Sequence, residues 1–219
     1  MASGQAGGAD GRLEKISDYH VARYGDRTVV PLNSSARLRA ELFRRWVGTG
    51  KRMLELGCGS GELLARYAAG NKVTAMDVDR PAVEACGARL GVEAVWGDFA
   101  TALPFADETF DAVIAAETLE HMPYPTIFLG EVRRVLRGGG LFIGSVPNAY
   151  RYRNRLDVLR GLPIDTDHTH VQFYSLASLR RALEGWFVVD DIVAVRGRWA
   201  HRWPSLFAHK FAWRSHRGA

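Results

Sequence analysis

The chain has 219 residues, of which 47% are hydrophobic and 24% are charged, and its formal net charge is +5. This length and hydrophobic content allow one large domain with a buried core. No apolar run approaches the roughly 20 residues that cross a bilayer, which excludes a membrane-spanning helix. The chain has two cysteines, so its composition favours a reducing, cytoplasmic setting over a disulfide framework.

Two segments precede the first predicted strand. Residues 1–11 are rich in Gly, Ala and Ser and predict a disordered tail that has neither the basic nor the apolar region of a signal peptide. Residues 12–50 predict two helices that serve as a lid or as packing elements, an amphipathic one over 12–25 and a second that begins after Asn33. The second helix is expected to bury Leu38, Leu42, Phe43 and Trp46.

A glycine-rich turn follows the first predicted strand. An apolar run over residues 53–56 leads into three glycines at alternating positions, which let the backbone turn sharply and lie against a ligand. These glycines are Gly57, Gly59 and Gly61. A second predicted strand, residues 73–77, ends in Asp77, where a carboxylate can accept hydrogen bonds from a ribose diol. Together the two features predict a site for a nucleoside-type cofactor.

The glycine spacing narrows the choice of cofactor. A dinucleotide-binding loop needs G-x-G-x-x-G, but counting from Gly57 the third glycine position holds Glu62. Counting from Gly59, that position holds Leu64. No lysine follows the loop, which excludes a P-loop, and a nicotinamide oxidoreductase becomes the weakest rival. The pattern E-x-G-x-G-x-G, which begins at Glu55, resembles motif I of the class I S-adenosylmethionine (SAM)-dependent methyltransferases.

The resemblance to this family covers residues 50–148 in order and spacing. The expected elements are helices over 81–90 and 126–137, strands over 93–96 and 141–146, a fourth strand entered through 103–114, and a helix-stopping glycine run at 138–140. The resemblance implies an α/β fold with a Rossmann-like, seven-stranded, mostly parallel sheet, helices on both faces and an antiparallel strand seven at the edge. The last two strands are expected over 186–189 and 192–195.

The same resemblance implies a domain organisation. A SAM-binding core would span residues 51–196 and carry a substrate insertion near 149–174. Ser175 would cap a helix over 176–183. A basic, aromatic segment, residues 197–219, would follow the core.

The resemblance also implies which residues hold SAM. The glycine loop would face the methionine end of the cofactor and Asp77 the ribose. Asp98 and Phe99 would contact the adenine. Glu117, at the carboxyl end of the fourth strand, would face a cationic group. The implied cofactor-binding residues are Glu55, Gly57, Cys58, Gly59, Gly61, Asp77, Val78, Asp98, Phe99 and Glu117.

Two histidines are candidate catalytic bases, because imidazole titrates near neutral pH and can take a proton from a hydroxyl group. His170 begins the stretch H-V-Q-F-Y-S, which resembles a segment of many small-molecule and quinone-type methyltransferases in which the histidine faces the substrate. His121 is the second candidate. A structural hydrogen bond is the alternative role for each of them.

A metal-assisted alternative stays open. Glu117, Glu120 and His121 form E-x-x-E-H and, with a later histidine, offer the donor set of a divalent ion. This arrangement resembles the metal site of the small-RNA 3′-terminal 2′-O-methyltransferases and of some ubiquinone-pathway O-methyltransferases. A metal there would polarise a hydroxyl group and remove the need for a free base.

The last part of the sequence is basic and aromatic. From Arg196 onward there are six Lys or Arg residues and no Asp or Glu. The aromatic residues among them are Trp199, Trp203, Phe207, Phe211 and Trp213. This composition suits a packing helix, a peripheral contact with a membrane or, less well, a nucleic acid.

The sequence therefore predicts a cytoplasmic SAM-dependent methyltransferase that O-methylates a small-molecule or lipid-linked acceptor and that lies peripheral to a membrane. Two alternatives remain: a metal-assisted RNA 2′-O-methyltransferase and a SAM-binding partner protein without activity. No motif identifies the acceptor.

Overall fold

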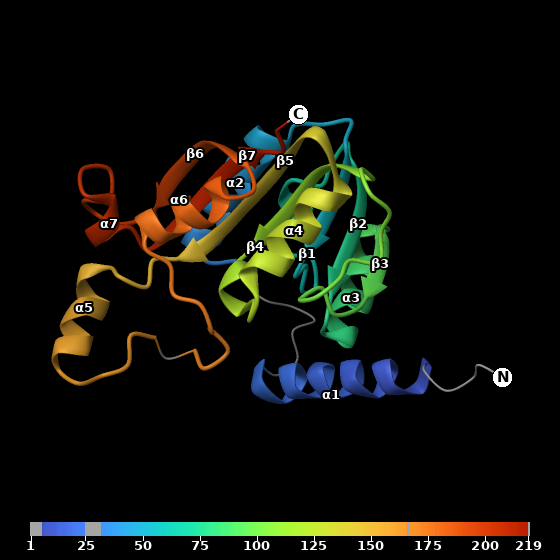
Figure 1. Cartoon of the computed structure of the whole chain (residues 1–219), viewed down its shortest axis with the longest axis horizontal. Coiled ribbons are helices and arrows are strands. Elements are labelled where there is room, and N and C mark those ends of the chain that lie inside the picture. Colours follow the sequence, from blue (N-terminus) through green and yellow to red (C-terminus); the bar gives the residue numbers. More distant parts are fainter. Residues whose placement is uncertain (1–5, 25–31, 166, 219) are drawn as a thin grey trace.

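The computed structural model describes residues 6–24, 32–165 and 167–218 of the chain. Within these ranges seven strands form one sheet in the order β3-β2-β1-β4-β5-β7-β6 (Figure 1). The strands are β1 Arg52–Leu56, β2 Lys72–Asp77, β3 Glu93–Trp96, β4 Phe110–Ala116, β5 Leu136–Pro147, β6 Val188–Val195 and β7 Lys210–His216. Strands β1 to β5 pair in parallel, and β7 runs antiparallel to both β5 and β6. The predicted α/β, Rossmann-like fold class is confirmed.

Helices cover both faces of the sheet (Figure 1). They are α1 Ala6–Tyr24, α2 Ser34–Val47, α3 Arg80–Leu90, α4 Pro125–Val135, α5 Tyr152–Leu159, α6 Leu176–Glu184 and α7 Pro204–Phe207, with 3-10 turns η1 Leu64–Arg66 and η2 Leu119–His121. Phe43 of α2 and Val83 of α3 belong to one buried cluster, and Phe128 of α4 and Leu183 of α6 belong to a second. The central strands are therefore buried on both sides, as parallel sheets require. Among the described residues no helix is both long and apolar enough to cross a membrane.

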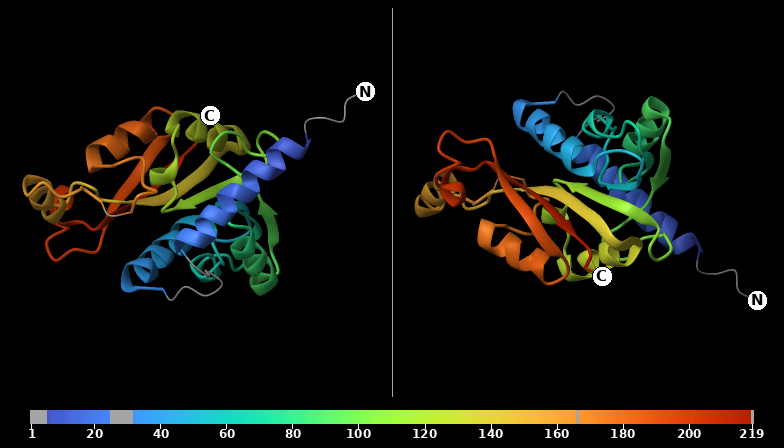
Figure 2. Two further views of the ribbon diagram at one scale, coloured as in Figure 1. Left: turned by 90° about the horizontal axis from the view of Figure 1, so that it is seen from below. Right: turned by 90° about the horizontal axis from the view of Figure 1, so that it is seen from above.

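Helix α1 lies apart from these two layers and crosses the carboxyl ends of the parallel strands (Figure 2, left). Contacts with the rest of the fold include a hydrogen bond that Arg12 donates to Asp98 and one that the hydroxyl of Ser17 accepts from the backbone N–H of Arg80. The helix begins at Ala6, so the predicted disordered tail over residues 1–11 is wrong for residues 6–11. Residues 1–5 lie outside the described part.

The last two strands differ from the prediction. Residues 188–195 form one strand, β6, in which the register with β7 shifts between Val189 and Asp191. The seventh strand comes from residues 210–216 and lies between β5 and β6, so β6 forms the edge of the sheet. The segment 197–219, predicted to lie outside the core, thus contributes a strand inside the sheet, next to the edge strand β6, and its Trp213 is fully buried.

The predicted helix caps are confirmed, whereas the predicted burial of Leu38 and the predicted end of α4 are wrong. Asn33 caps α2 and Ser175 caps α6, as predicted. Leu38 was expected to be buried but is 51% exposed, because it lies on the outer side of α2. Helix α4 ends at Val135, and the glycines at 138–140 lie in the first part of β5 and do not stop a helix.

Candidate active site

The loop after β1 is shaped by its glycines. Gly57, Gly59 and Gly61 have φ values of 76°, 50° and 83°, in the left-handed region that glycine tolerates best. A Cβ on Gly57 would lie 2.7 Å from the hydroxyl of Thr118, and one on Gly61 would lie 2.8 Å from the sulfur of Cys86. A Cβ on Gly59 would meet nothing within 4 Å, so that glycine borders open space. The loop therefore presents bare backbone at the carboxyl end of the sheet.

Asp77 connects this loop to the end of β2. Its carboxylate accepts hydrogen bonds from the backbone N–H of Gly59 at 2.7 Å and of Asp79 at 2.9 Å. A carboxylate offers about four lone-pair positions, which leaves capacity for a ribose diol. The position fits the predicted role, which remains a prediction. Val78 follows Asp77 and is partly buried.

Glu55 lies beneath the glycine loop and is buried. One carboxyl oxygen accepts a hydrogen bond from the hydroxyl of Tyr67 at 2.7 Å, and the other has no hydrogen-bond partner among the described residues. Burial raises the pKa of Glu55 well above its usual range. Cys58, within the loop, is also buried.

The predicted adenine contacts lie under α1. Asp98 accepts hydrogen bonds from the backbone N–H of Ala100 at 2.8 Å and from Arg12 at 3.3 Å. Phe99 is 5% exposed and its ring packs against Phe128, so it belongs to the core as well as to the predicted site. A pocket of about 530 Å³ is lined by one side of α1, namely Gly11, Arg12, Lys15, Ile16 and Tyr19.

These features fit SAM. The loop supplies bare backbone, and Asp77 supplies hydrogen-bond acceptors for a diol. SAM carries a ribose diol, which matches these acceptors. A pyrophosphate would need a different glycine spacing.

Glu117 lies directly after β4 with a φ of 56°, a conformation that costs a non-glycine residue energy. Its carboxylate contacts three groups: Arg39 of α2 at 2.7 Å, the hydroxyl of Ser145 at 2.9 Å and the amine of Lys210. Arg39 also donates to Ser145 at 2.9 Å. The cationic partner that Glu117 was predicted to face is thus supplied by the protein. Its proposed part in cofactor binding remains untested.

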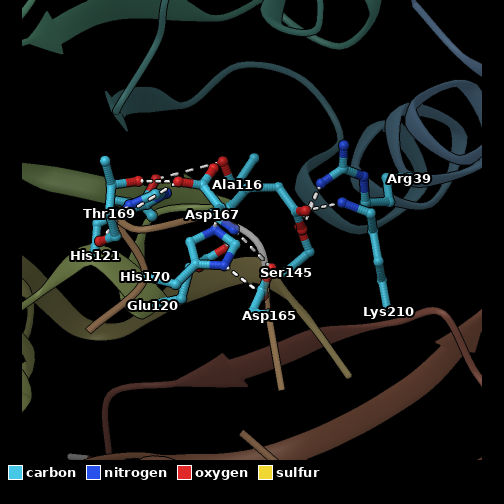
Figure 3. Close-up of polar contacts among 12 residues, drawn as sticks. Arg39, Ala116, Glu120, His121, Ser145, Asp165, Asp167, Thr169, His170 and Lys210 are labelled. Atoms are coloured by element: carbon cyan, nitrogen blue, oxygen red, sulfur yellow. Dashed lines mark hydrogen bonds and ion pairs between the residues drawn. The ribbon is translucent and has the colours of Figure 1, made fainter. Parts of the chain in front are cut away.

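The two candidate histidines lie next to each other, with ring centroids 4.7 Å apart (Figure 3). Nδ1 of His170 contacts the carboxylate of Asp165 at 2.7 Å. Nδ1 of His121 contacts the carbonyl oxygen of Thr169 at 3.1 Å. The backbone of Glu120 accepts hydrogen bonds from the N–H groups of residues 171 and 172, which attaches this insertion to η2.

Glu120 completes the histidine cluster. Its carboxyl group is 2% exposed, and neither oxygen has a hydrogen-bond partner among the described residues. One oxygen lies 4.0 Å from Nε2 of His170. Burial raises the pKa of Glu120 to about 8.

Ligand atoms of Glu120, His121 and His170 lie within 4.8 Å of one another, close enough to hold a metal ion. Of the tentative metal set, the described structure brings Glu120 and His121 together with His170. Glu117, the third member, faces Arg39 and Lys210 instead. The later histidine that the sequence pattern required is therefore His170.

Four residues of this site carried no assigned role at the sequence level: Arg39, Ser145, Asp165 and Lys210. The motif D-T-D-H-T-H places Asp165 five residues before His170, and this spacing was the available signal. Arg39, Ser145 and Lys210 come from three distant elements, α2, β5 and β7. No local pattern links them.

Comparisons with known proteins agree with the geometry. The family model described as a methyltransferase domain matches residues 54–144. The chain is 38% identical over 127 residues to the fatty-acid O-methyltransferase of Mycolicibacterium smegmatis, a match that covers 52% of this chain and 46% of the relative. It is 41% identical over 100 residues to the probable phthiotriol/phenolphthiotriol dimycocerosates methyltransferase 2 of Mycobacterium ulcerans, covering 43% and 38%. The chain thus spans less than half the length of these relatives.

Solved structures share the fold at low identity. The [4+2]-cyclase SpnF superposes with a TM-score of 0.69 at 18% identity, over 94% of this chain and 97% of that one. The 1,6-didemethyltoxoflavin-N1-methyltransferase of Burkholderia thailandensis superposes with a TM-score of 0.66 at 19% identity, over 100% and 92%. The latter structure holds S-adenosylhomocysteine.

Proposed function

Because this chain belongs to the class I SAM-dependent methyltransferases, we propose that it transfers the methyl group of SAM to a hydroxyl oxygen of a lipid or lipophilic small molecule. The observation that carries the proposal is a histidine oriented by an aspartate: His170, held by Asp165, lies against His121 at the end of η2. The hydroxyl of Thr118 donates to the carbonyl oxygen of Leu56 at 3.0 Å, which joins the start of the glycine loop to η2. His121 closes η2 and contacts His170.

The lipophilic acceptor is supported by the relatives. The fatty-acid and phthiotriol enzymes match 52% and 43% of this chain, and both names specify lipid substrates. A lipid acceptor is held at a membrane, so peripheral membrane contact is part of the same proposal. Reaction at a carboxylate would need no base, since a carboxyl group is ionised at neutral pH. The His170–Asp165 pair favours a hydroxyl group instead.

The protein's own residues have three tasks in this mechanism. SAM supplies an electrophilic methyl group when bound, and the glycine loop, Asp77 and Asp98 would hold it. Asp165 holds Nδ1 of His170, so that Nε2 carries the lone pair. His170 would then take the proton of the acceptor hydroxyl as its oxygen bonds to the methyl carbon. Helix α1, over the carboxyl ends of the strands, would exclude water.

A second candidate function is metal-assisted RNA 2′-O-methylation. It is favoured by the closeness of Glu120, His121 and His170, whose ligand atoms suit a divalent ion. In that reaction these side chains would bind the ion, and His170 would no longer serve as a free base.

The test is a methyl-transfer assay with radiolabelled SAM and the purified full chain. The acceptors are a long-chain hydroxy lipid, a fatty acid and a short RNA with a free 3′ end, each with and without EDTA. Transfer to the hydroxy lipid that survives EDTA is the expected result. Transfer to RNA that EDTA abolishes would establish the second candidate. Calorimetric binding of S-adenosylhomocysteine without transfer to any acceptor would favour a non-catalytic partner protein.

A further inference from the structure

Two segments far apart in the sequence form one end of the molecule (Figures 1 and 2). One is residues 150–162, which contains α5, and the other is residues 196–207, which contains α7. The ring of Tyr152 lies 5.3 Å from that of Phe207. The side chain of Asn148 donates hydrogen bonds to the carbonyl oxygens of Ser205 and Ala208 at 3.2 and 3.0 Å. These two segments are called the α5–α7 face below.

The α5–α7 face exposes large apolar side chains. Leu159 is 82% exposed and Leu162 is 52% exposed. Six further side chains of this face are exposed: Tyr150, Tyr152, Leu156, Val158, Trp199 and Trp203. All residues of α5 and α7 are described, and none of them is buried. A patch that combines aliphatic and aromatic side chains in this way marks an interaction surface.

The same face is strongly basic. Its two segments hold seven arginines, no lysine and one acidic residue, Asp157, which pairs with Arg160 at 3.5 Å. Three of the arginines lie over exposed rings: Arg153 over Tyr152, Arg198 over Trp199 and Arg202 over Trp203. Arginines from both segments also lie near one residue, His209. Burial lowers the pKa of His209, and the charges of Arg151, Arg196 and Arg153 add to that effect.

Arginine, tryptophan and tyrosine with exposed leucines are the side chains that a membrane interface accommodates. The cations meet anionic headgroups, the aromatic rings lie at headgroup level and the aliphatic chains enter the boundary of the hydrocarbon. A nucleic acid would also use the arginines and the aromatic rings. It would leave Leu159 and Leu162 in water, so the composition of the face favours lipid.

We propose that the α5–α7 face binds the surface of an anionic lipid bilayer, with Trp203 at headgroup level and Leu159 and Leu162 at the boundary of the hydrocarbon. This role rests on the proposed function, because docking on a bilayer would give the enzyme access to a lipid acceptor. The insertion that carries α5 continues into the loop of Asp165 and His170. A bilayer docked on this face would therefore lie on the acceptor side of the enzyme.

Vesicle co-sedimentation without SAM tests the proposal. The full chain is mixed with vesicles of phosphatidylcholine alone or with about one third phosphatidylglycerol, at low and high salt. We expect binding to the anionic vesicles that weakens at high salt, together with a blue shift of tryptophan emission. The double variant L159E/L162E should bind at least 10-fold more weakly. L38E, which changes a leucine on α2 that is as exposed as Leu162, should bind as wild type does.

Charge-reversal variants test the electrostatic contribution to vesicle binding. R155E/R160E should lose the preference for anionic vesicles, whereas R180E/R181E, on the exposed side of α6, should keep it. Wild-type protein that ignores anionic vesicles, or L159E/L162E that binds them normally, would overturn the proposal. Binding of single-stranded RNA that R155E/R160E abolishes, without vesicle binding, would assign the face to nucleic acid. Loss of the proposed function would appear separately, as wild-type protein that binds vesicles but transfers no methyl group.

Discussion

The carboxylate of Asp165 lies 2.7 Å from Nδ1 of His170, and this contact defines which nitrogen of the ring can react. An ionised carboxylate only accepts hydrogen bonds, so Nδ1 carries the hydrogen and Nε2 carries the lone pair. Nε2 points toward Glu120, beside His121. Asp165 is therefore a positioning residue for His170.

Replacement of His170 tests its role as the base. His170→Ala should lower turnover of a hydroxyl acceptor by about 100-fold, because the proton then lacks an acceptor. Binding of S-adenosylhomocysteine, measured by calorimetry, should not change. His168→Ala is the matched control, since that histidine is exposed and two residues away. Turnover that survives in His170→Ala would make this histidine structural.

Asp165→Asn tests whether Asp165 positions the ring of His170. The amide can present either an oxygen or an NH₂ group to Nδ1, so the preferred tautomer is lost and turnover should fall by about 10-fold. The pH–rate profile should shift as well, which a purely structural role would not cause. A profile identical to that of the wild type would exclude the positioning role.

The ribose role of Asp77 predicts a loss of cofactor affinity. Asp77→Ala removes charge-assisted hydrogen bonds and should weaken binding of S-adenosylhomocysteine by about 1–3 kcal/mol. Isothermal titration measures the change directly. Asp191→Ala, at the far edge of the sheet on β6, should bind as wild type does. Unchanged affinity in Asp77→Ala would remove this carboxylate from the site.

The ion pair between Arg39 and Glu117 predicts a stability effect. Arg39→Ala leaves a largely buried carboxylate with Lys210 as its remaining cationic partner, and should cost about 3 kcal/mol in urea unfolding. Arg44→Ala removes an exposed arginine of the same helix and should leave stability nearly unchanged, because exposed ion pairs contribute little. Equal stability of the two variants would contradict a structural role for the pair.

The buried carboxyl group of Glu120 should make the stability of the protein depend on pH. Its pKa is about 8 in the folded protein and 4.5 in a solvated reference, so the folded state binds the proton more tightly. Stability is therefore lost as pH rises from about 4.5 to 8, by an amount on the order of 4 kcal/mol. Glu120→Gln should flatten this slope in urea unfolding at pH 5, 6.5 and 8. Glu84→Gln, an exposed change on α3, should keep the slope of the wild type. A slope that is equally steep without Glu120 would assign it to other groups.

Gly144 tests the packing of the seventh strand. A Cβ there would lie 2.3 Å from the ring of Trp213 and 2.5 Å from the carbonyl oxygen of Ala115. Gly144→Ala should destabilise the protein by about 3 kcal/mol, because the buried ring has no room to move. Gly138→Ala, where a Cβ meets nothing within 4 Å, should be nearly neutral. Thermal unfolding of both variants gives the comparison.

The sequence alone located the glycine loop and the strands β1 to β5. The glycine loop, the acid that ends β2 and the caps at Asn33 and Ser175 are local signals, because backbone conformation and capping depend on neighbouring residues. Buried parallel strands likewise appear as short apolar runs, so β1 to β5 could be located from their own residues.

Tertiary structure alone decided the rest. The two strands expected over 186–189 and 192–195 are replaced by a single strand, β6, whose register with β7 shifts between Val189 and Asp191. The strand β7 was hidden in a basic, aromatic segment, because its burial depends on β5 and β6 on either side. The pairing of Arg39 with Glu117 and the closeness of α5 to α7 depend on chain segments that only the folded sheet brings together.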